Sequence, residues 1–244
     1  MSIPLSVSVI MPVYNEESSI EHGVAAVVDY LGSLPDCRFE LIIIESGSTD
    51  ATGAITDTIA AQRREVRVIH EGRRNGFGNA VRLGYREARM DWVWLITPDL
   101  PFPLEKFGEA VPLLRQYDAV LSYRVKDPRS SMRKFQSLVF NYLVRIAFGL
   151  KARHINSAFK ILRRSFVQSF DFQSTGWTID VEVLWGLKTQ GARVIELPVE
   201  LYDRTAGQSK IGMGTAVGVL KELFRIWKIR LRRKRLVNRA CAGE

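Results

Sequence analysis

The sequence predicts an α/β fold in which helices cover both faces of a mostly parallel sheet. Two observations support this prediction. Short apolar runs of strand length alternate with segments of helical spacing along the first 125 residues. Each run ends in a turn with Gly, Pro, Asn, Ser or acidic side chains, and open α/β sheets bind ligands beyond such strand ends. We therefore expect the first 125 residues to form one doubly wound unit.

The elements follow from the pattern in chain order. Strands are expected at residues 5–13, 39–44, 66–70, 92–96 and 119–123 because these runs are apolar and short. Helices are expected at residues 18–31, 50–63, 75–89 and 104–116, with Asp50 as a plausible N-cap of the second. No window contains about 18 consecutive apolar residues, so we expect no membrane-spanning helix.

The fourth predicted strand leads into the most informative turn. The apolar run from Trp92 to Ile96 stops at Thr97-Pro98, and one carboxylate, Asp99, follows at once. Mg²⁺ is usually bound by one or two carboxylates together with substrate phosphates, so an Asp at this position suits a metal. A second acid two residues earlier would complete the site, but that position holds Thr97.

Three other turns are expected along the same sheet edge. Residues 12–16 follow the first strand, residues 45–48 follow the second, and Asn75 to Asn79 open a helix. A glycine-rich helix start such as Gly76-x-Gly78 can present backbone N–H groups and a positive dipole end to a phosphate. A simple tight turn explains the same two glycines equally well.

Seven motifs, in order from about residue 6 to about residue 212, carry a resemblance to a known family. They are Ile10-Met-Pro-Val-Tyr-Asn-Glu16, Ile42-Ile-Ile-Glu-Ser-Gly-Ser-Thr-Asp50, Arg74-Asn-Gly-Phe-Gly-Asn-Ala80, Ser157-Ala-Phe-Lys160, Gly176-Trp-Thr-Ile-Asp-Val-Glu182, Glu196-Leu-Pro-Val199 and Arg204-Thr-Ala-Gly-Gln-Ser-Lys210. The sequence resembles family 2 glycosyltransferases of the GT-A fold, in the dolichyl-phosphate mannose synthase-like branch. The resemblance implies an inverting enzyme that moves a sugar from a GDP- or UDP-linked donor to a polyprenyl phosphate.

The resemblance also implies roles for individual residues. Asp99 would be the surviving acid of a metal-binding Asp-x-Asp motif that holds Mg²⁺ or Mn²⁺. Pro12, Tyr14, Glu16 and Glu45 would hold the base and ribose. The whole set expected to line the nucleotide-sugar site is Pro12, Tyr14, Glu16, Glu45, Gly47, Asn75, Gly76, Gly78 and Thr97.

Three basic residues are expected to meet the phosphates. Arg124, Arg204 and Lys210 would contact the donor diphosphate and the acceptor phosphate, whose negative charges need cations before they can approach each other. The plainer alternative is a solvated basic loop for Arg204 and Lys210 and a strand-end charge for Arg124.

The sequence departs from the family pattern at several positions. Glu45-Ser46 stands where the family has two aspartates, and His154 stands where Asp is common. In the metal motif, Thr97 occupies the first position, which is acidic in the family, and Pro101 stands where a polar ligand is expected two residues after Asp99. Because a Thr hydroxyl is a poor Mg²⁺ ligand, three interpretations stay open. The metal binds through Asp99 and the donor alone, basic side chains replace the metal, or turnover has been lost.

The acceptor decides whether a general base is needed. A phosphate monoester is largely ionised at pH 7 and attacks the anomeric carbon directly, so it requires none. A hydroxyl acceptor needs a carboxylate, for which Asp180 is the candidate, although a helix N-terminus favours an acid there in any case. A degenerate nucleotide-sugar-binding regulatory subunit is the non-enzymatic alternative.

Two further segments bear on the membrane. Residues 132–150 are apolar nearly all round, which is typical of a core helix or of a helix in lipid. Residues 215–236 have the spacing of a basic amphipathic helix, and residues 221–239 carry nine basic side chains and one acid, Glu222. We expect this tail to bind an anionic membrane surface rather than nucleic acid.

The expected organisation follows from these segments. A glycosyltransferase domain at residues 1–212 would have a nucleotide-binding half at about 1–125 and an acceptor half at about 126–212, followed by the basic tail at 213–244. No signal peptide is visible, and two cysteines, Cys37 and Cys241, fit a reducing compartment. We therefore expect a cytoplasmic protein, peripheral on the cytoplasmic face of a membrane.

Overall fold

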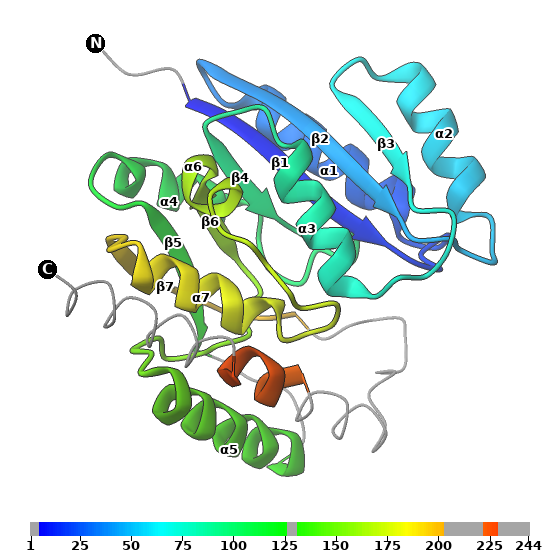
Figure 1. The fold of residues 1–244 in the computed structure, drawn as a ribbon. Helices are drawn as coiled ribbons and strands as arrows, with labels where there is room; N and C mark the ends of the chain where they lie inside the picture. The colour runs from blue at the N-terminus through cyan, green and yellow to red at the C-terminus, as the bar shows by residue number, and fades with distance from the viewer. Residues whose placement is uncertain (1–4, 126–130, 203–221, 229–244) are drawn as a thin grey trace, which may run out of the picture.

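The computed structural model of the chain describes residues 5–125, 131–202 and 222–228. Its seven-stranded sheet has the order β3-β2-β1-β4-β6-β5-β7 (Figure 1). The strands are β1 (Leu5–Val13), β2 (Cys37–Glu45), β3 (Val66–His70), β4 (Trp92–Leu95), β5 (Ala119–Arg124), β6 (Lys160–Arg163) and β7 (Val194–Val199). The helices include α1 (Ile20–Ser33), α2 (Thr52–Gln62), α3 (Phe77–Glu87), α4 (Glu105–Ala110), α5 (Ser131–Phe148), α6 (Arg164–Gln168) and α7 (Ile179–Thr189).

The mostly parallel sheet predicted from the sequence is confirmed. The pairs β1–β2, β1–β4, β2–β3 and β5–β7 are parallel. The short strand β6 is antiparallel to both β4 and β5 and separates them. The sheet is therefore mixed, and its antiparallel member lies beside the strand that leads to Asp99.

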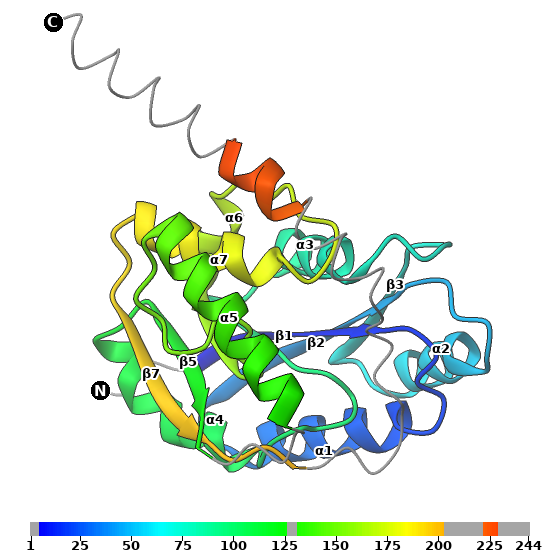
Figure 2. The same ribbon diagram turned by 90° about the horizontal axis from the view of Figure 1, so that it is seen from below.

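Helices cover both faces of the sheet, as predicted (Figure 2). Alternate residues of β1 point to opposite faces, because Ile10 packs with α3 and α7 in one core whereas Val9 and Met11 pack with α1 in the other. The first core also takes Val144 and Phe148 from α5. Two buried cores therefore hold the sheet between two helical layers.

One predicted helix was wrong in its extent. The segment expected as a single helix at 104–116 divides into α4 and a 3₁₀ turn at Val111–Arg115. Pro112 lies in the first turn of the 3₁₀ segment, and a proline cannot donate the hydrogen bond that would continue an α-helix through it.

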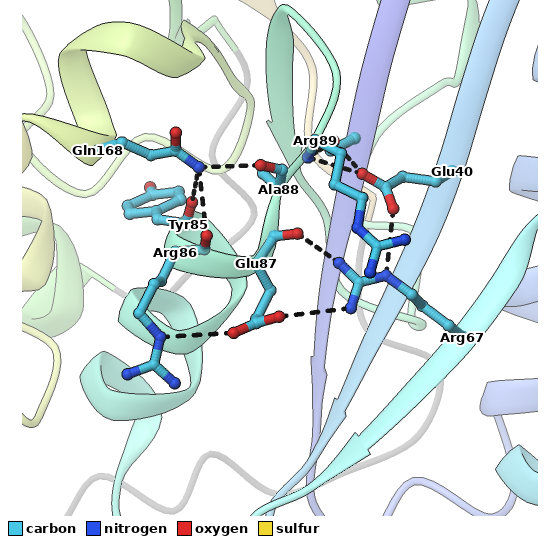
Figure 3. A network of polar contacts seen from close by, with 9 residues as sticks. Glu40, Arg67, Tyr85, Arg86, Glu87, Ala88, Arg89 and Gln168 are labelled. Carbon is cyan, nitrogen blue, oxygen red and sulfur yellow. Dashed lines mark hydrogen bonds and ion pairs between the residues drawn. The ribbon is translucent and has the colours of Figure 1, made fainter.

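A polar network at the end of the sheet opposite the turns fixes the C-terminus of α3 (Figure 3). The buried Glu40 carboxylate accepts hydrogen bonds from Arg67 Nε at 3.1 Å and from the Arg89 N–H at 2.8 Å. The Gln168 side chain of α6 donates to the carbonyls of Tyr85, Arg86 and Ala88. These bonds satisfy the last carbonyls of α3, so the helix is anchored far from its glycine-rich start.

Candidate active site

The turns that follow β1 and β2 are tied together by hydrogen bonds. Asn15, whose φ is 55°, donates its N–H to Ser48 Oγ at 3.0 Å and accepts from the Thr49 N–H at 2.9 Å. The Glu16 N–H donates to Thr52 Oγ1 at 2.8 Å. The turns that carry Tyr14, Glu16, Glu45 and Gly47 therefore form one polar surface at the carboxyl edge of the sheet. Of the predicted residues in this region, Pro12 is buried inside β1, opposite Ile44.

Glu45 is almost fully buried at the end of β2. Its Oε1 accepts the Ser48 N–H at 2.6 Å and its Oε2 lies 3.0 Å from His70 Nδ1, while His70 Nε2 lies 2.8 Å from Asp57 Oδ1. Burial raises the pKa of Glu45, but hydrogen bonds from Ser48 and His70 outweigh it and hold the pKa below its usual value. Hydrogen bonds to Asp57 and Glu45 raise the pKa of His70. A charged Glu45 thus shapes the turn that contains Gly47.

The glycine-rich turn before α3 lies against the loop at residues 175–176. Gly78 donates its N–H to the Thr175 carbonyl at 2.9 Å, and a Cβ on Gly76, whose φ is 97°, would lie 2.4 Å from the same oxygen. Both positions therefore require glycine for a close approach of two backbones. Asn75 accepts from Arg73 Nε at 3.0 Å, so the predicted Asn75, Gly76 and Gly78 form one fixed turn.

The Thr97–Asp99 turn lies beyond β4, between β1 and α1. The Thr97 hydroxyl donates a 2.5 Å hydrogen bond to Asp99 Oδ1, and the Leu100 N–H closes the turn on the Thr97 carbonyl at 3.1 Å. Gly23 of α1 lies directly under Pro98, because a Cβ on Gly23 would be 2.4 Å from the Pro98 carbonyl oxygen. The Asp99 carboxylate is therefore positioned by its own turn and by the packing of α1.

Arg124 ends β5 and is held by the loop that precedes β6. Its backbone N–H donates to His154 Nδ1 at 3.0 Å, and its Nη2 donates to the Asn156 carbonyl at 3.2 Å. His154, which replaces a common Asp, thus supports the strand end that carries the guanidinium. The predicted Arg204 and Lys210 lie outside the described residues.

Asp180 lies in the first turn of α7 and is paired with a buried lysine. Lys160 Nζ is 3.1 Å from Asp180 Oδ1, and the two side chains are 3% and 9% exposed. Lys160 also donates to the Ser157 carbonyl and is paired with Leu95 of β4 and Leu121 of β5 in the sheet. Burial raises the pKa of Asp180, and the charges of Lys160 and Arg124 oppose that rise.

Lys160 belongs to one of the seven motifs but had no predicted role, and Glu222 had no predicted contact. Glu222 Oε1 accepts the N–H groups of Thr175 and Gly176 at 2.6 and 3.1 Å. The segment 222–228 is thereby fastened to the loop that rests on the glycine-rich turn. The available signals were a lysine inside an apolar run and a single acid within a basic tail.

The residues present suit a metal ion that is coordinated mainly by the phosphate oxygens of a bound nucleotide and by water, with one carboxylate from the protein. Within the described parts of the chain, no group of three or more His, Cys, Asp or Glu side chains could enclose a metal. Asp99 provides one carboxylate, with the Thr97 hydroxyl bonded to it. Mg²⁺ in phosphate-binding sites commonly takes one or two carboxylates and completes its shell with phosphate oxygens and waters, so this donor set fits that kind of binding.

Comparison with known proteins places the chain in a family. Residues 8–185 match the family described as Glycosyl transferase family 2. The chain is 26% identical over 222 residues to the undecaprenyl-phosphate mannosyltransferase of Micrococcus luteus, which covers 86% of this chain and 89% of that protein. It is 27% identical over 248 residues to the dolichol-phosphate mannosyltransferase of Pyrococcus furiosus, and this alignment covers 98% of this chain and 68% of that protein. It is 31% identical over 234 residues to glycosyltransferase AglD of Haloferax volcanii, covering 91% of this chain but only 37% of that longer protein.

Solved structures share the fold. Glucosyl-3-phosphoglycerate synthase from Mycobacterium tuberculosis, in complex with phosphoglyceric acid, superposes with a TM-score of 0.65 at 22% identity, covering 84% of this chain and 73% of that one. The same enzyme with Mn²⁺, UDP and glucosyl-3-phosphoglycerate gives a TM-score of 0.62 at 22% identity, and the match covers 84% of this chain and 73% of that one. These matches support the GT-A assignment of the mixed sheet. The chain belongs to glycosyl transferase family 2.

Proposed function

We propose that the protein is an inverting glycosyltransferase that moves a sugar from a GDP- or UDP-linked donor to a polyprenyl phosphate at a membrane surface. The observation that carries this proposal is the Asp99 turn, which is fixed by Thr97 and Gly23 beside the antiparallel strand that contains Lys160. Relatives named as polyprenyl-phosphate sugar transferases, at 26 and 27% identity, support the acceptor class.

The donor would lie across the turns at the carboxyl edge of β1, β2 and β4. The surface formed by Tyr14, Glu16 and the Glu45–Ser48 turn would hold the base and ribose, and Asp99 would face the diphosphate. A Mg²⁺ or Mn²⁺ ion bound by Asp99 and the diphosphate would neutralise the charge that develops on the leaving nucleotide. Arg124, with Arg204 and Lys210, would bring the acceptor phosphate close to the donor.

The transfer requires little proton chemistry. A phosphate oxygen of the acceptor forms a bond to the anomeric carbon while the bond from that carbon to the diphosphate breaks, which inverts the anomeric configuration. The acceptor is already largely ionised because its second pKa is about 6, so no base is needed. The protein contributes orientation and electrostatic stabilisation.

A transferase with a hydroxyl acceptor is the second candidate, and the ion pair of Asp180 with Lys160 is the observation that bears on it. Lys160 Nζ lies 3.1 Å from Asp180 Oδ1 and stabilises the carboxylate, which is the form that accepts a proton. Under this alternative Asp180→Asn abolishes transfer per folded molecule, whereas transfer to a phosphate largely survives in the molecules that stay folded after Lys160 has lost its charged partner. The third candidate function is that of a regulatory subunit without turnover. In that case the protein would bind a nucleotide sugar but form no product.

The test is transfer of radiolabelled sugar to defined acceptors. Purified protein is incubated with labelled GDP- or UDP-sugars and either a polyprenyl phosphate or the corresponding polyprenol. Label in the phosphate lipid alone supports the proposal, and label in the polyprenol alone assigns the hydroxyl reaction. Because phosphodiester-linked sugar is released by mild acid, hydrolysis of the product identifies the new bond.

A further inference from the structure

The helix α5 turns two polar contacts and a narrow apolar strip toward the protein, and it turns a broader set of apolar side chains away from it. Asn141 is buried and its Oδ1 accepts the Ile155 N–H at 2.9 Å, while Arg145 Nε donates to the Ala152 carbonyl at 2.8 Å. Among its large apolar residues, only Val144 and Phe148 are buried in the core. An ordinary surface helix also packs an apolar stripe on the core, but its outward face is polar.

The outward side of α5 is a continuous apolar face. Its members recur at the helical spacing of three and four residues and are 40–66% exposed. They are Met132, Phe135, Leu138, Val139, Tyr142, Leu143 and Ile146. Soluble monomers rarely expose a contiguous apolar patch of this extent unless it meets a partner or a membrane. The interfacial interpretation of residues 132–150 is thereby favoured over the core interpretation.

A second segment with exposed apolar side chains, residues 222–228, has its backbone on the same side of the molecule as α5 (Figure 1). Phe224 and Trp227 stack with ring centroids 5.8 Å apart and are 53% and 36% exposed. Ile226 of the same segment is buried in the core that also contains Val144 and Phe148 of α5. Aromatic side chains of this kind concentrate at membrane–water interfaces.

In the sequence, basic residues are concentrated within and next to the segments that carry these two apolar features. Residues 126–153 contain seven basic side chains and one acid, and residues 221–239 contain nine basic side chains and one acid. The net charge of the whole chain is +9, so the remainder is negative overall. The helix α5 itself contains no Asp or Glu. An apolar face accompanied by exposed basic side chains, such as Lys134 and Lys151 with α5 and Arg225 and Lys228 with Phe224 and Trp227, is complementary to a bilayer that contains anionic lipid.

We propose that the outward face of α5 and the Phe224–Trp227 pair form one surface that docks on an anionic lipid bilayer. A second copy of the chain is a poorer occupant, because a symmetric dimer would place these exposed basic side chains near their own copies. Docking here would bring the fold to the leaflet that holds a polyprenyl phosphate, so the role of this surface in catalysis rests on the proposed function.

The test measures vesicle binding without sugar transfer. The full chain is sedimented with phosphatidylcholine vesicles that contain or lack phosphatidylglycerol. The triple substitution Phe135→Gln, Leu138→Gln and Ile146→Gln should lower partition onto the anionic vesicles about tenfold or more, since each change removes exposed apolar surface. Val194→Gln is the control, because it removes an exposed apolar side chain from the edge strand β7, outside the proposed surface, and it should bind the vesicles as the wild-type protein does.

The outcomes separate the surface from the reaction. Equal vesicle binding by the wild-type protein and the triple variant, with unchanged circular dichroism, overturns the inference. A wild-type dimer that the triple substitution dissociates, without vesicle binding, also overturns it. Loss of vesicle binding with retained transfer to a short-chain polyprenyl phosphate in detergent supports both proposals. The same loss, with no transfer by the wild-type protein to any acceptor, supports the surface and contradicts the proposed function.

Discussion

The Thr97 hydroxyl donates a 2.5 Å hydrogen bond to Asp99 Oδ1, so the residue that replaces an acid orients the acid that remains. A second carboxylate at this position would repel Asp99 until a cation bound between them, whereas the hydroxyl stabilises Asp99 in the absence of metal. Under the proposed function the turn would bind a cation through one charge, and its affinity would depend on phosphate oxygens from the donor.

Restoring the acid tests this dependence. Thr97→Asp should lower the Mn²⁺ concentration that half-restores transfer after EDTA treatment, by about tenfold, because two carboxylates bind a divalent ion better than one. Thr97→Val is the matched variant, since it removes the hydroxyl without adding charge, and it should reduce the rate a few-fold. If metal dependence and rate are the same in Thr97→Asp as in the wild-type protein, Asp99 needs no partner or binds no metal.

The packing of α1 against this turn gives a second prediction. In Gly23→Ala the new Cβ would lie 2.4 Å from the Pro98 carbonyl oxygen, so the turn or the helix must shift. We expect a loss of about 1–3 kcal/mol in the free energy of unfolding and a fall of at least about tenfold in kcat/KM. Gly32→Ala changes the same helix where no atom lies within 4 Å, and it should stabilise the protein by about 0.5–1 kcal/mol.

Urea unfolding and transfer kinetics check both alanine variants. Equal stability and equal kcat/KM in Gly23→Ala and Gly32→Ala would show that contact with α1 does not position the Asp99 turn.

The buried pair of Lys160 and Asp180 gives a third prediction. Lys160→Met leaves the Asp180 carboxylate buried without its 3.1 Å partner, which should cost about 3–5 kcal/mol in the free energy of unfolding. The double variant Lys160→Met, Asp180→Leu should recover much of this loss because no charge is left unpaired. Lys106→Met breaks the more exposed pair with Glu109 and should cost about 1 kcal/mol or less.

Urea unfolding of the three variants checks this prediction. A loss in Lys160→Met no larger than that in Lys106→Met would contradict a stabilising role for the buried pair.

The contact between His70 and Glu45 makes stability depend on pH. The pKa of His70 is raised, so its contribution is fully present below about pH 6.5 and is lost as the pH rises through its folded-state pKa. The pKa of Glu45 is lowered, so its contribution is present above about pH 4.5 and is lost as the pH falls further. The pair should therefore stabilise the protein most between about pH 4.5 and 6.5.

The measurement compares urea midpoints at pH 6 and pH 8. The wild-type protein should lose stability between these values, and His70→Gln should lose less. His22→Gln replaces an exposed histidine of α1 and should behave as the wild-type protein does. Identical pH dependence in His70→Gln and the wild-type protein would show that His70 does not cause the loss of stability between pH 6 and pH 8.

The parts of the fold that were predicted from sequence are those with a strong local pattern. The strands β1 to β5 are long enough or apolar enough to be seen, and each ends in a marked turn. The strand β6 has only four residues, and its place between β4 and β5 depends on pairing across the sheet rather than on local pattern. The apolar residues at 132–150 predicted a helix, but only packing shows which of its faces is exposed.

In the candidate site, too, the features with a local sequence pattern were predicted and the contacts between distant residues were not. The turns at Tyr14, Glu45 and Asp99 were found because strand ends of a parallel sheet share an edge, and the structure places them there. The contacts of Lys160 with Asp180 and of Glu222 with the 175–176 loop join residues 20 and 46 or more positions apart in the sequence, so no local spacing reveals them.

In the structure's described residues, no helix combines the length and hydrophobicity required to cross a bilayer.

The most direct test of the central claim is transfer of labelled sugar by the wild-type protein and by Asp99→Asn. Each protein is incubated with a polyprenyl phosphate and a panel of GDP- and UDP-sugars, in Mn²⁺ and after EDTA. We predict an acid-labile, polyprenyl-phosphate-linked sugar from the wild-type protein in Mn²⁺, with a rate at least about a hundredfold lower for Asp99→Asn. Absence of product from the wild-type protein with every donor, or equal rates from the two proteins, would contradict the account.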